Sequence, residues 1–156
     1  MPETNEPNRA KLVEALRLLG EVYATQVAIF QQGAATKIGL GVTDIKALSI
    51  LLREGPQSAG ALMRQLNLTS GAVTGVIERL RRRHLVRRQI DPADRRRAII
   101  SADTEALAEA PNPYLGIGAA FDQLHERYSS DQLVFLTQYL EAATRITIEQ
   151  AAELGD

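Results

Sequence analysis

The side chains in this sequence with the clearest chemistry are nine arginines that fall within nineteen consecutive residues, Arg79 to Arg97. The same segment holds two acidic residues, Asp91 and Asp94, so its local charge is +7. The whole 156-residue chain has 18 basic and 19 acidic residues, which leaves the rest of the chain acidic. Because clustered guanidinium groups repel one another and bind phosphate oxygens well, the segment predicts a polyanionic partner rather than a solvated charged face.

Other kinds of reactive site have little support in the residue types present. The chain has no cysteine, which excludes disulfides, thiolate catalysis and cysteine-based sensing. Its two histidines, His84 and His125, lie on different predicted elements, so a zinc site would need carboxylates such as Asp122 or Glu126. There is no nucleophile elbow, phosphate-binding glycine loop or HExxH motif. We therefore expect a protein that is not an enzyme and that has neither a metal nor a cofactor.

Membrane insertion and export also lack a sequence signal. The apolar runs are only a few residues long, well short of the roughly 20 that span a bilayer. The first eight residues are acidic and contain prolines, unlike the basic and apolar start of a signal peptide. We expect these residues to be a flexible lead-in and the protein to be cytoplasmic, with no membrane partner.

The elements that must position the arginines begin with two short helices. Ser58 and Thr69 are N-cap residues eleven positions apart, with a tight turn at Asn67-Leu68 between the helices that they open. The second helix runs from Ser70 to about Arg83, and its apolar residues share one face. This layout predicts a helix-turn-helix. The residues on or beside the exposed face of the second helix are Ser70, Gly71, Thr74, Gly75 and Arg79.

A hairpin follows the helix-turn-helix. Residues 85–90 alternate apolar and polar side chains, and residues 98–101 form a second β-prone run. Between them lies DPADRRR, Asp91 to Arg97, which predicts a turn with an arginine-rich tip.

Long helices are predicted on both sides of this unit. Apolar residues recur every three or four positions from Arg9 to Gln32, and Gly33 breaks the pattern. Thr43 is the predicted cap of a further helix, which ends at Gly55-Pro56.

The last third of the chain is again helical in pattern. A helix that begins near Thr104 is interrupted by Pro111 and Pro113, and another covers residues 119–128. Ser129 and Gln132 form a capping box for a final helix that reaches Glu153. That helix is too long to bury itself on a core of this size.

The stretch LMRQLNLTSGAVTGVIERLRRRHLVRRQIDPADRRRAIIS, Leu62 to Ser101, resembles the winged helix-turn-helix of the multiple-antibiotic-resistance regulator (MarR) family of bacterial transcription regulators. TSGAVTGVIERL is similar to the family's DNA-binding helix, and DPADRRR is similar to its wing. The resemblance implies a mainly α-helical fold with a small β-hairpin wing and with terminal helices that join two chains into a homodimer. The implied organisation is a flexible N-terminus at 1–8, a dimerisation helix and linker at 9–41, a DNA-binding lobe at 42–102 and C-terminal dimerisation helices at 103–156.

This resemblance implies that the arginine segment binds double-stranded DNA at a pseudo-palindromic operator. The free N–H groups and small side chains at the start of the second helix suit a major groove, and an arginine at a hairpin tip suits a narrow minor groove. Arg79 is expected to reach a phosphate or to pair with a wing aspartate. Asp94 is expected to orient the wing through an ion pair. The expected DNA-binding residues are Thr69, Ser70, Gly71, Thr74, Gly75, Arg79, Arg95, Arg96 and Arg97.

The chain departs from the family pattern at two positions. Gly75 stands where relatives carry a larger polar or basic residue, which favours reading of DNA shape over direct contacts to bases. His84 stands where relatives have the glycine that ends the helix, so either histidine takes a left-handed conformation or the helix continues.

A small-molecule effector is also implied by the resemblance, because family members bind aromatic or lipophilic compounds between the dimer helices and the DNA-binding lobe. The candidate pocket residues are Tyr23, Phe30, Tyr114 and Phe121, each of which also fits a plain core position. The sequence therefore favours a repressor that such a ligand releases from DNA. The alternatives are a winged-helix module that binds RNA or an acidic protein, and an architectural DNA binder that responds to no ligand.

Overall fold

The computed structural model describes residues 8–91 and 98–154. Its helices and strands follow in the order α1 Arg9–Lys37, α2 Val42–Glu54, β1 Gln57–Ser58, α3 Ala59–Gln65, α4 Ser70–Arg82, β2 Val86–Ile90, β3 Ala98–Ala102, α5 Thr104–Glu109, α6 Leu115–His125 and α7 Ser130–Glu153. The expected mainly helical fold with a small hairpin is confirmed.

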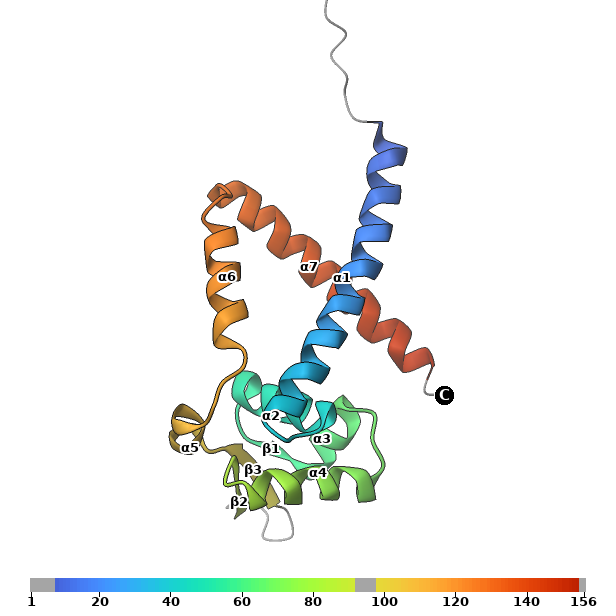
Figure 1. The fold of residues 1–156 in the computed structure, drawn as a ribbon. Helices are drawn as coiled ribbons and strands as arrows, with labels where there is room; N and C mark the ends of the chain where they lie inside the picture. Colours follow the sequence, from blue (N-terminus) through green and yellow to red (C-terminus); the bar gives the residue numbers. More distant parts are fainter. Residues whose placement is uncertain (1–7, 92–97, 155–156) are drawn as a thin grey trace, which may run out of the picture.

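A three-stranded antiparallel sheet with the order β1-β3-β2 lies beside the helices of the central part (Figure 1). Strands β2 and β3 pair from Val86 opposite Ala102 to Ile90 opposite Ala98, as the alternation of residues predicts. No residue pattern predicts β1, which contributes only two residues to the edge of β3. A two-residue strand is too short to show a period of two.

The hydrophobic core lies within one part of the chain, residues 38–110, which we call the lobe. Buried residues from α2, α3, α4, β2 and β3 form a single cluster there. Leu62, Val76, Leu80 and Ile100 are each at most 2% exposed. Helix α4 therefore has one face fixed in the core, as its pattern of apolar residues predicts.

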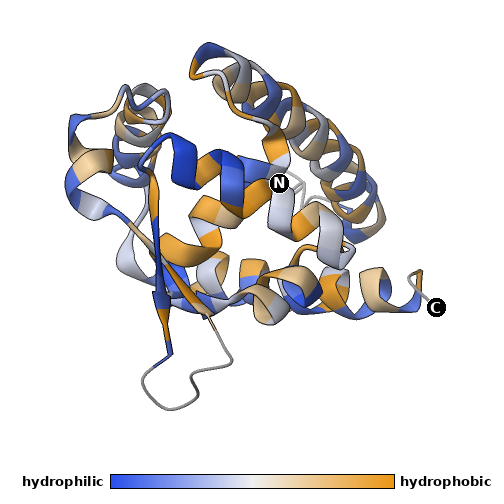
Figure 2. Ribbon diagram, turned by 90° about the horizontal axis from the view of Figure 1, so that it is seen from below, coloured by the Kyte–Doolittle hydropathy of each residue, from blue (hydrophilic) through white to orange (hydrophobic). Residues whose placement is uncertain are grey.

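Helices α6 and α7 form an arm that leads away from the lobe (Figure 1). Neither helix has a buried residue. Apolar residues recur along the helix that leads to the C-terminus (Figure 2), and Phe135 on that helix is 66% exposed. The arm thus presents apolar surface that a single chain does not cover.

Several helix boundaries differ from those expected. Helix α1 passes through Gly33 to Lys37, because one glycine inside a helix costs only about 1 kcal/mol and the following Ala34 and Ala35 are buried. Gly41, and not Thr43, is the N-cap of α2. Helix α6 covers Leu115–His125 rather than 119–128 and begins two residues after Pro113.

The expected caps of α3, α4 and α7 are confirmed. Ser58 and Thr69 accept hydrogen bonds from Ala61 N and Ala72 N, at 3.2 and 3.3 Å. Ser129 and Gln132 form the expected reciprocal capping box of α7. None of the helices among the described residues has the length and apolar character that crossing a membrane requires.

Candidate nucleic-acid interface

The exposed surface of α4 begins at a tight turn that its sequence allows. Asn67 adopts a left-handed backbone conformation, with φ of 50°, and so ends α3 two residues before the cap of α4. Asparagine tolerates this region better than most residues because its side chain forms local hydrogen bonds. The turn leaves the N-terminus of α4 at the surface, since Thr69, Ser70 and Gly71 are all exposed.

The first two turns of α4 combine free backbone donors with small side chains. A Cβ added at Gly71 would meet no atom within 4 Å, so the surface there is open. The hydroxyl of Thr74 donates to the carbonyl of Ser70 at 2.8 Å, so its oxygen keeps lone pairs that can accept hydrogen bonds from another molecule. This end of α4 is slim enough to approach another molecule closely, and its N–H groups favour an anion such as a phosphate.

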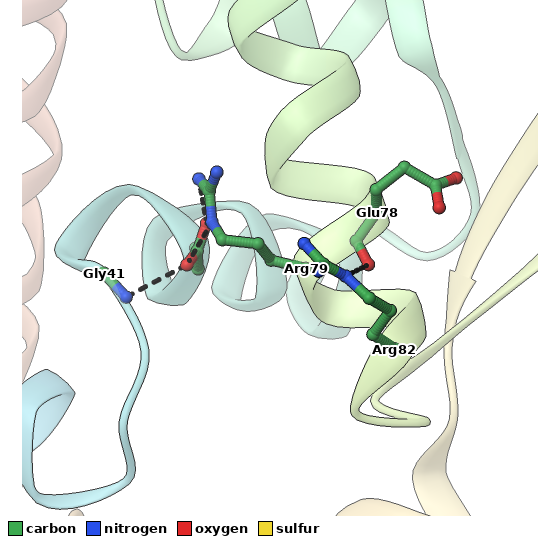
Figure 3. A network of polar contacts seen from close by, with 5 residues as sticks. Gly41, Glu78, Arg79 and Arg82 are labelled. Atoms are coloured by element: carbon green, nitrogen blue, oxygen red, sulfur yellow. Dashed lines mark hydrogen bonds and ion pairs between the residues drawn. The ribbon is translucent and has the colours of Figure 1, made fainter.

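Arg79, which we expected to reach a phosphate or a wing aspartate, is paired with a residue that the sequence analysis missed. Its Nε and Nη2 donate to both carboxylate oxygens of Asp44 at 2.7 to 3.1 Å. The same carboxylate accepts a hydrogen bond from Gly41 N at 3.0 Å (Figure 3). Asp44 raises the pKa of the Arg79 guanidinium above its usual value.

A signal for Asp44 was present in the sequence. Positions 44, 47, 48 and 51 lie on one face of α2 at helical spacing, and all four are buried. Asp44 is the acidic member of an otherwise apolar set. A buried carboxylate needs a cationic or hydrogen-bonding partner, so its position pointed to an ion pair, although not to which arginine.

Other arginines of the segment also have partners inside the protein. Arg81 pairs with Glu78 at 3.0 Å on the same helix. Arg83 donates from Nη1 to the carbonyl of Ile38 at 2.5 Å. Within the described residues, Arg82 makes one hydrogen bond, to the carbonyl of Glu78 at 3.4 Å (Figure 3), and no ion pair.

Arg87 joins β2 to the start of α5. Its guanidinium pairs with Asp103 at 2.6 Å and with Glu105 at 3.1 Å. Hydrogen bonds from Arg87 hold the pKa of Asp103 below its usual value, and the two carboxylates raise that of Arg87. The arginine segment is therefore partly structural, because Arg79, Arg81 and Arg87 are each paired with carboxylates.

The expected wing residues Asp94, Arg95, Arg96 and Arg97 lie outside the described residues. The strands on either side of them, β2 and β3, pair in register from Val86 opposite Ala102 to Ile90 opposite Ala98. His84 has φ of 58°, so histidine takes the left-handed position that ends α4. This was one of the two outcomes expected at this position.

A cavity of about 1340 Å³ lies where the end of α1, helix α2 and the connection between α5 and α6 meet. Tyr114 lines it, and Phe30 packs edge-on against Tyr114 with 5.4 Å between the ring centroids. The structure thus brings together two of the four expected pocket residues. In the single chain Tyr23 is 55% exposed and Phe121 lies beside His125, both away from the residues that line the cavity.

The walls of this cavity are apolar with a cationic contribution. Among the described lining residues there are four basic side chains and no acidic one. The basic side chains are Lys37, Lys46, Arg53 and Arg83. The hydroxyl of Tyr114 is buried without a hydrogen-bond partner in the described part of the chain, and burial raises its pKa. Arg53 is paired with Glu54 at 2.9 Å and Arg83 with the carbonyl of Ile38, so Lys37 and Lys46 are the lining cations without an ion pair in the described structure. These two lysines make the cavity fit an apolar molecule that carries an anionic group. No group of three potential metal ligands occurs within residues 8–91 and 98–154.

Comparison with known proteins agrees with this architecture. Residues 40–98 match the model of the MarR family. Over 142 residues the chain is 31% identical to the uncharacterized HTH-type transcriptional regulator YcgE of Bacillus subtilis (strain 168), a match that covers 91% of this chain and 90% of YcgE. It is 35% identical over 91 residues to the HTH-type transcriptional repressor NicR of Pseudomonas putida (strain KT2440), covering 58% of this chain and 57% of NicR. The fold is similar to that of overoxidized AbfR bound to DNA, with a TM-score of 0.52, 20% identity and coverage of 90% of this chain and 96% of AbfR.

Proposed function

This chain belongs to the MarR family of transcriptional regulators, which are not enzymes, and on that premise we propose that it is a homodimeric repressor that binds a pseudo-palindromic DNA operator. The observation that carries the proposal is the exposed, slender N-terminal half of α4, held on a buried face and followed by an arginine-rich hairpin. AbfR, which shares the fold, has been solved bound to DNA, and NicR is a repressor.

In this proposal α4 enters the major groove. Thr69, Ser70 and Gly71 bring backbone N–H groups to a phosphate. Gly75 adds no side chain to the exposed face of α4, so this face can approach the DNA closely. The lone pairs of Thr74 accept hydrogen bonds from the amino groups of adenine or cytosine. Arg95, Arg96 and Arg97 supply the minor-groove and phosphate contacts of the wing, oriented by Asp94.

Dimerisation is supported by the surface of the terminal helices. Helices α6 and α7 bury nothing in one chain, and Leu16 and Leu19 of α1 are 55% and 62% exposed. A second copy that covers these faces would present two α4 helices to successive major grooves. Residues 9–41 and 103–156 would then form the dimerisation region, and residues 42–102 the DNA-binding lobe.

The cavity supports release by a small ligand. Its apolar walls suit an aromatic or lipophilic molecule, and its basic residues favour one with a carboxylate or phenolate group. A ligand that prefers a dimer whose α4 helices are wrongly spaced for the operator weakens DNA binding in proportion to its differential affinity.

The DNA proposal is tested with duplexes selected from a randomised 40-base-pair library on the wild-type protein. We expect the affinity to fall steeply with salt, and Arg95→Ala with Arg96→Ala to weaken binding by at least about tenfold. The matched control, Arg9→Ala with Arg17→Ala, removes the same charge at the start of α1. If the wing variant binds as tightly as the wild type, the wing assignment is wrong. If RNA or an acidic protein is bound in preference to every duplex, DNA is not the partner.

The ligand proposal is tested on the same duplex with 2-naphthoate, 2-naphthol and 2-naphthylmethylamine. We expect the anion to release DNA at lower concentration than the neutral or cationic compound, and to raise the melting temperature of the protein. No effect of any of the three would favour an architectural DNA binder that responds to no ligand.

A further inference from the structure

Arg79 of α4 and Arg83, the C-cap residue of this helix, reach away from its proposed DNA face, towards the place where α1 leads into α2. We call the connection between α1 and α2 together with the first residues of α2, residues 38–44, the corner. Arg79 and Arg83 are four positions apart and therefore lie on the same side of the helix end. Arg79 binds the carboxylate of Asp44, and Arg83 binds the carbonyl of Ile38. Both links join residues 35 or more positions apart in the sequence.

The link to Asp44 is the stronger one, because the carboxylate is 1% exposed. Its two oxygens accept from two guanidinium nitrogens and from Gly41 N, which satisfies most of its hydrogen-bonding capacity. Removing the cation would leave a buried charge without compensation, which is strongly destabilising. Arg79 is therefore not available to leave this partner for a DNA phosphate, although 48% of its side chain is exposed.

Two glycines make room for these guanidinium groups. A Cβ built at Gly39 would lie 2.7 Å from Nη2 of Arg83, and the backbone there has φ of 64°. A Cβ at Gly75 would lie 3.3 Å from Nη1 of Arg79. Gly75 is one of the two positions that depart from the family pattern, and the structure gives it a role in admitting Arg79.

From these contacts we infer that Arg79 and Arg83 are positioning residues, which fix α4 against the corner and do not contact DNA phosphates. This inference rests on the proposed DNA-binding function. Bidentate pairing to a buried carboxylate fixes direction as well as distance, because the planar guanidinium matches the carboxylate in one orientation. The two links hold the end of α4 at a set angle to the end of α1, and so set the spacing of two α4 helices in a dimer.

Arg79→Lys is the principal variant, because it keeps the positive charge but removes the bidentate geometry. Asp44→Asn removes the buried charge and leaves an oxygen to accept from Gly41 N. Arg82→Lys is the matched control, on the same helical turn and without an ion pair in the described structure. The affinity of each variant is measured for the duplex that the wild type selects, and for duplexes with one base pair more or fewer between the half-sites.

We expect Arg79→Lys and Asp44→Asn each to weaken binding by about tenfold, about 1.4 kcal/mol, with no further loss when they are combined. The dependence of affinity on salt should keep the wild-type slope, because no phosphate contact is lost. Discrimination between spacings should decrease in both variants. Arg83→Gln should behave similarly with a smaller effect, and Arg82→Lys should match the wild type.

A phosphate contact from Arg79 would give a different set of results. Arg79→Lys would then bind almost normally, Asp44→Asn would bind more tightly, and Arg79→Gln would lower the salt slope by about 1.8 for a dimer, at 0.9 per contact. Any of these overturns the inference. If the wild type selects no duplex, the proposed function fails. The positioning role of Arg79 and Arg83 is then tested by amide hydrogen exchange. Arg79→Lys must then speed exchange in both the corner and α4, and unchanged exchange overturns the inference without reference to DNA.

Discussion

The lobe and the arm are built from similar helices but differ in what a single chain buries. In the lobe, α2, α3, α4 and the sheet share one core, and its central side chains are excluded from solvent. In the arm, apolar residues also recur along α6 and α7, but none of them is buried. Helix α1, outside both regions, shows the same contrast along its length, because Ala34 and Ala35 are buried near the lobe while Leu12 is 48% exposed at the other end.

This difference assigns the two regions to different sources of stability. The lobe is stabilised by hydrophobic burial within one chain, which holds α4 in a fixed position. The arm obtains it only when another surface covers α6 and α7, which is the usual situation of helices that interlock two subunits. Substitutions in the arm should therefore change assembly, and substitutions in the lobe should change folding.

The largest expected effect comes from placing charges on the arm. Phe135→Asp with Leu140→Asp puts two carboxylates on apolar positions that are 66% and 59% exposed in one chain. We expect the dissociation constant of the dimer to rise by at least about a thousandfold, since central apolar residues of an interface each contribute 2 kcal/mol or more. Sedimentation velocity measures the change. The control, Gln138→Asp with Gln150→Asp, adds the same charge at polar positions and should leave the dimer intact. A wild type that is monomeric at micromolar concentration would contradict the proposed difference between the lobe and the arm.

A cavity in the lobe should have the next largest effect. Leu62 is fully buried on α3, which packs against α4 and the sheet, so Leu62→Ala should lower the free energy of unfolding by about 2 to 5 kcal/mol. Urea unfolding followed by circular dichroism checks this, with the dimer verified in the absence of urea. Leu18→Ala, at a position of α1 that is 62% exposed, is the counterpart from the proposed dimerisation region. It should raise the dissociation constant of the dimer in sedimentation velocity, whereas Leu62→Ala should leave that constant nearly unchanged.

The same contrast explains which structural features could be predicted from the sequence. Caps and periodicity are local signals, so Ser58, Thr69 and Ser129 were identified as helix starts and the hairpin was placed correctly. The continuation of α1 through Gly33 depends on burial of the next two alanines by the lobe, which is a tertiary effect. The N-cap of α2 was missed because Asp44, three residues on, accepts from Gly41 N and makes glycine an effective cap.

The candidate site was predictable in its surface but not in its internal pairing. The exposed residues of α4 follow from helical geometry and from the apolar face opposite them. The partners of Arg79, Arg83 and Arg87 lie on other elements, and no local spacing links them. The assignment of DNA contacts to Thr69–Gly75 and to the wing stays a prediction, as does the lining of a ligand site by Tyr23, Phe30, Tyr114 and Phe121.

A smaller effect is expected at the cavity, where the lobe meets the arm. Tyr114→Phe removes a buried hydroxyl that has no hydrogen-bond partner in the described structure. We expect the variant to be as stable as the wild type or more stable by about 1 kcal/mol, because a buried unsatisfied hydroxyl is unfavourable. If the hydroxyl serves a ligand, the same variant should bind 2-naphthoate about tenfold more weakly. Thermal melting with and without the compound measures both quantities, and a clear loss of stability in the free protein would show that the hydroxyl has a structural partner.

The smallest expected effect is a pH dependence at the point where the chain leaves the sheet for α5. Asp103 caps α5 through Ala106 N and pairs with Arg87, and Asp103→Asn keeps an oxygen for the cap while removing the charge. Since the ion pair lowers the pKa of Asp103 in the folded protein, it stabilises the fold above the carboxyl's usual pKa of 3.8 and loses this effect as the pH falls through the lower, folded value. Wild type and variant should therefore differ at pH 7 in low salt and converge as the pH falls below the lowered pKa of the folded protein, with a smaller difference at 1 M salt. Urea unfolding over this pH range measures the difference in the free energy of unfolding. The same measurement with Arg87→Gln and with the double variant isolates the contribution of the Asp103–Arg87 pair. If Asp103→Asn has the same effect in the Arg87→Gln background, the effect belongs to the helix cap instead.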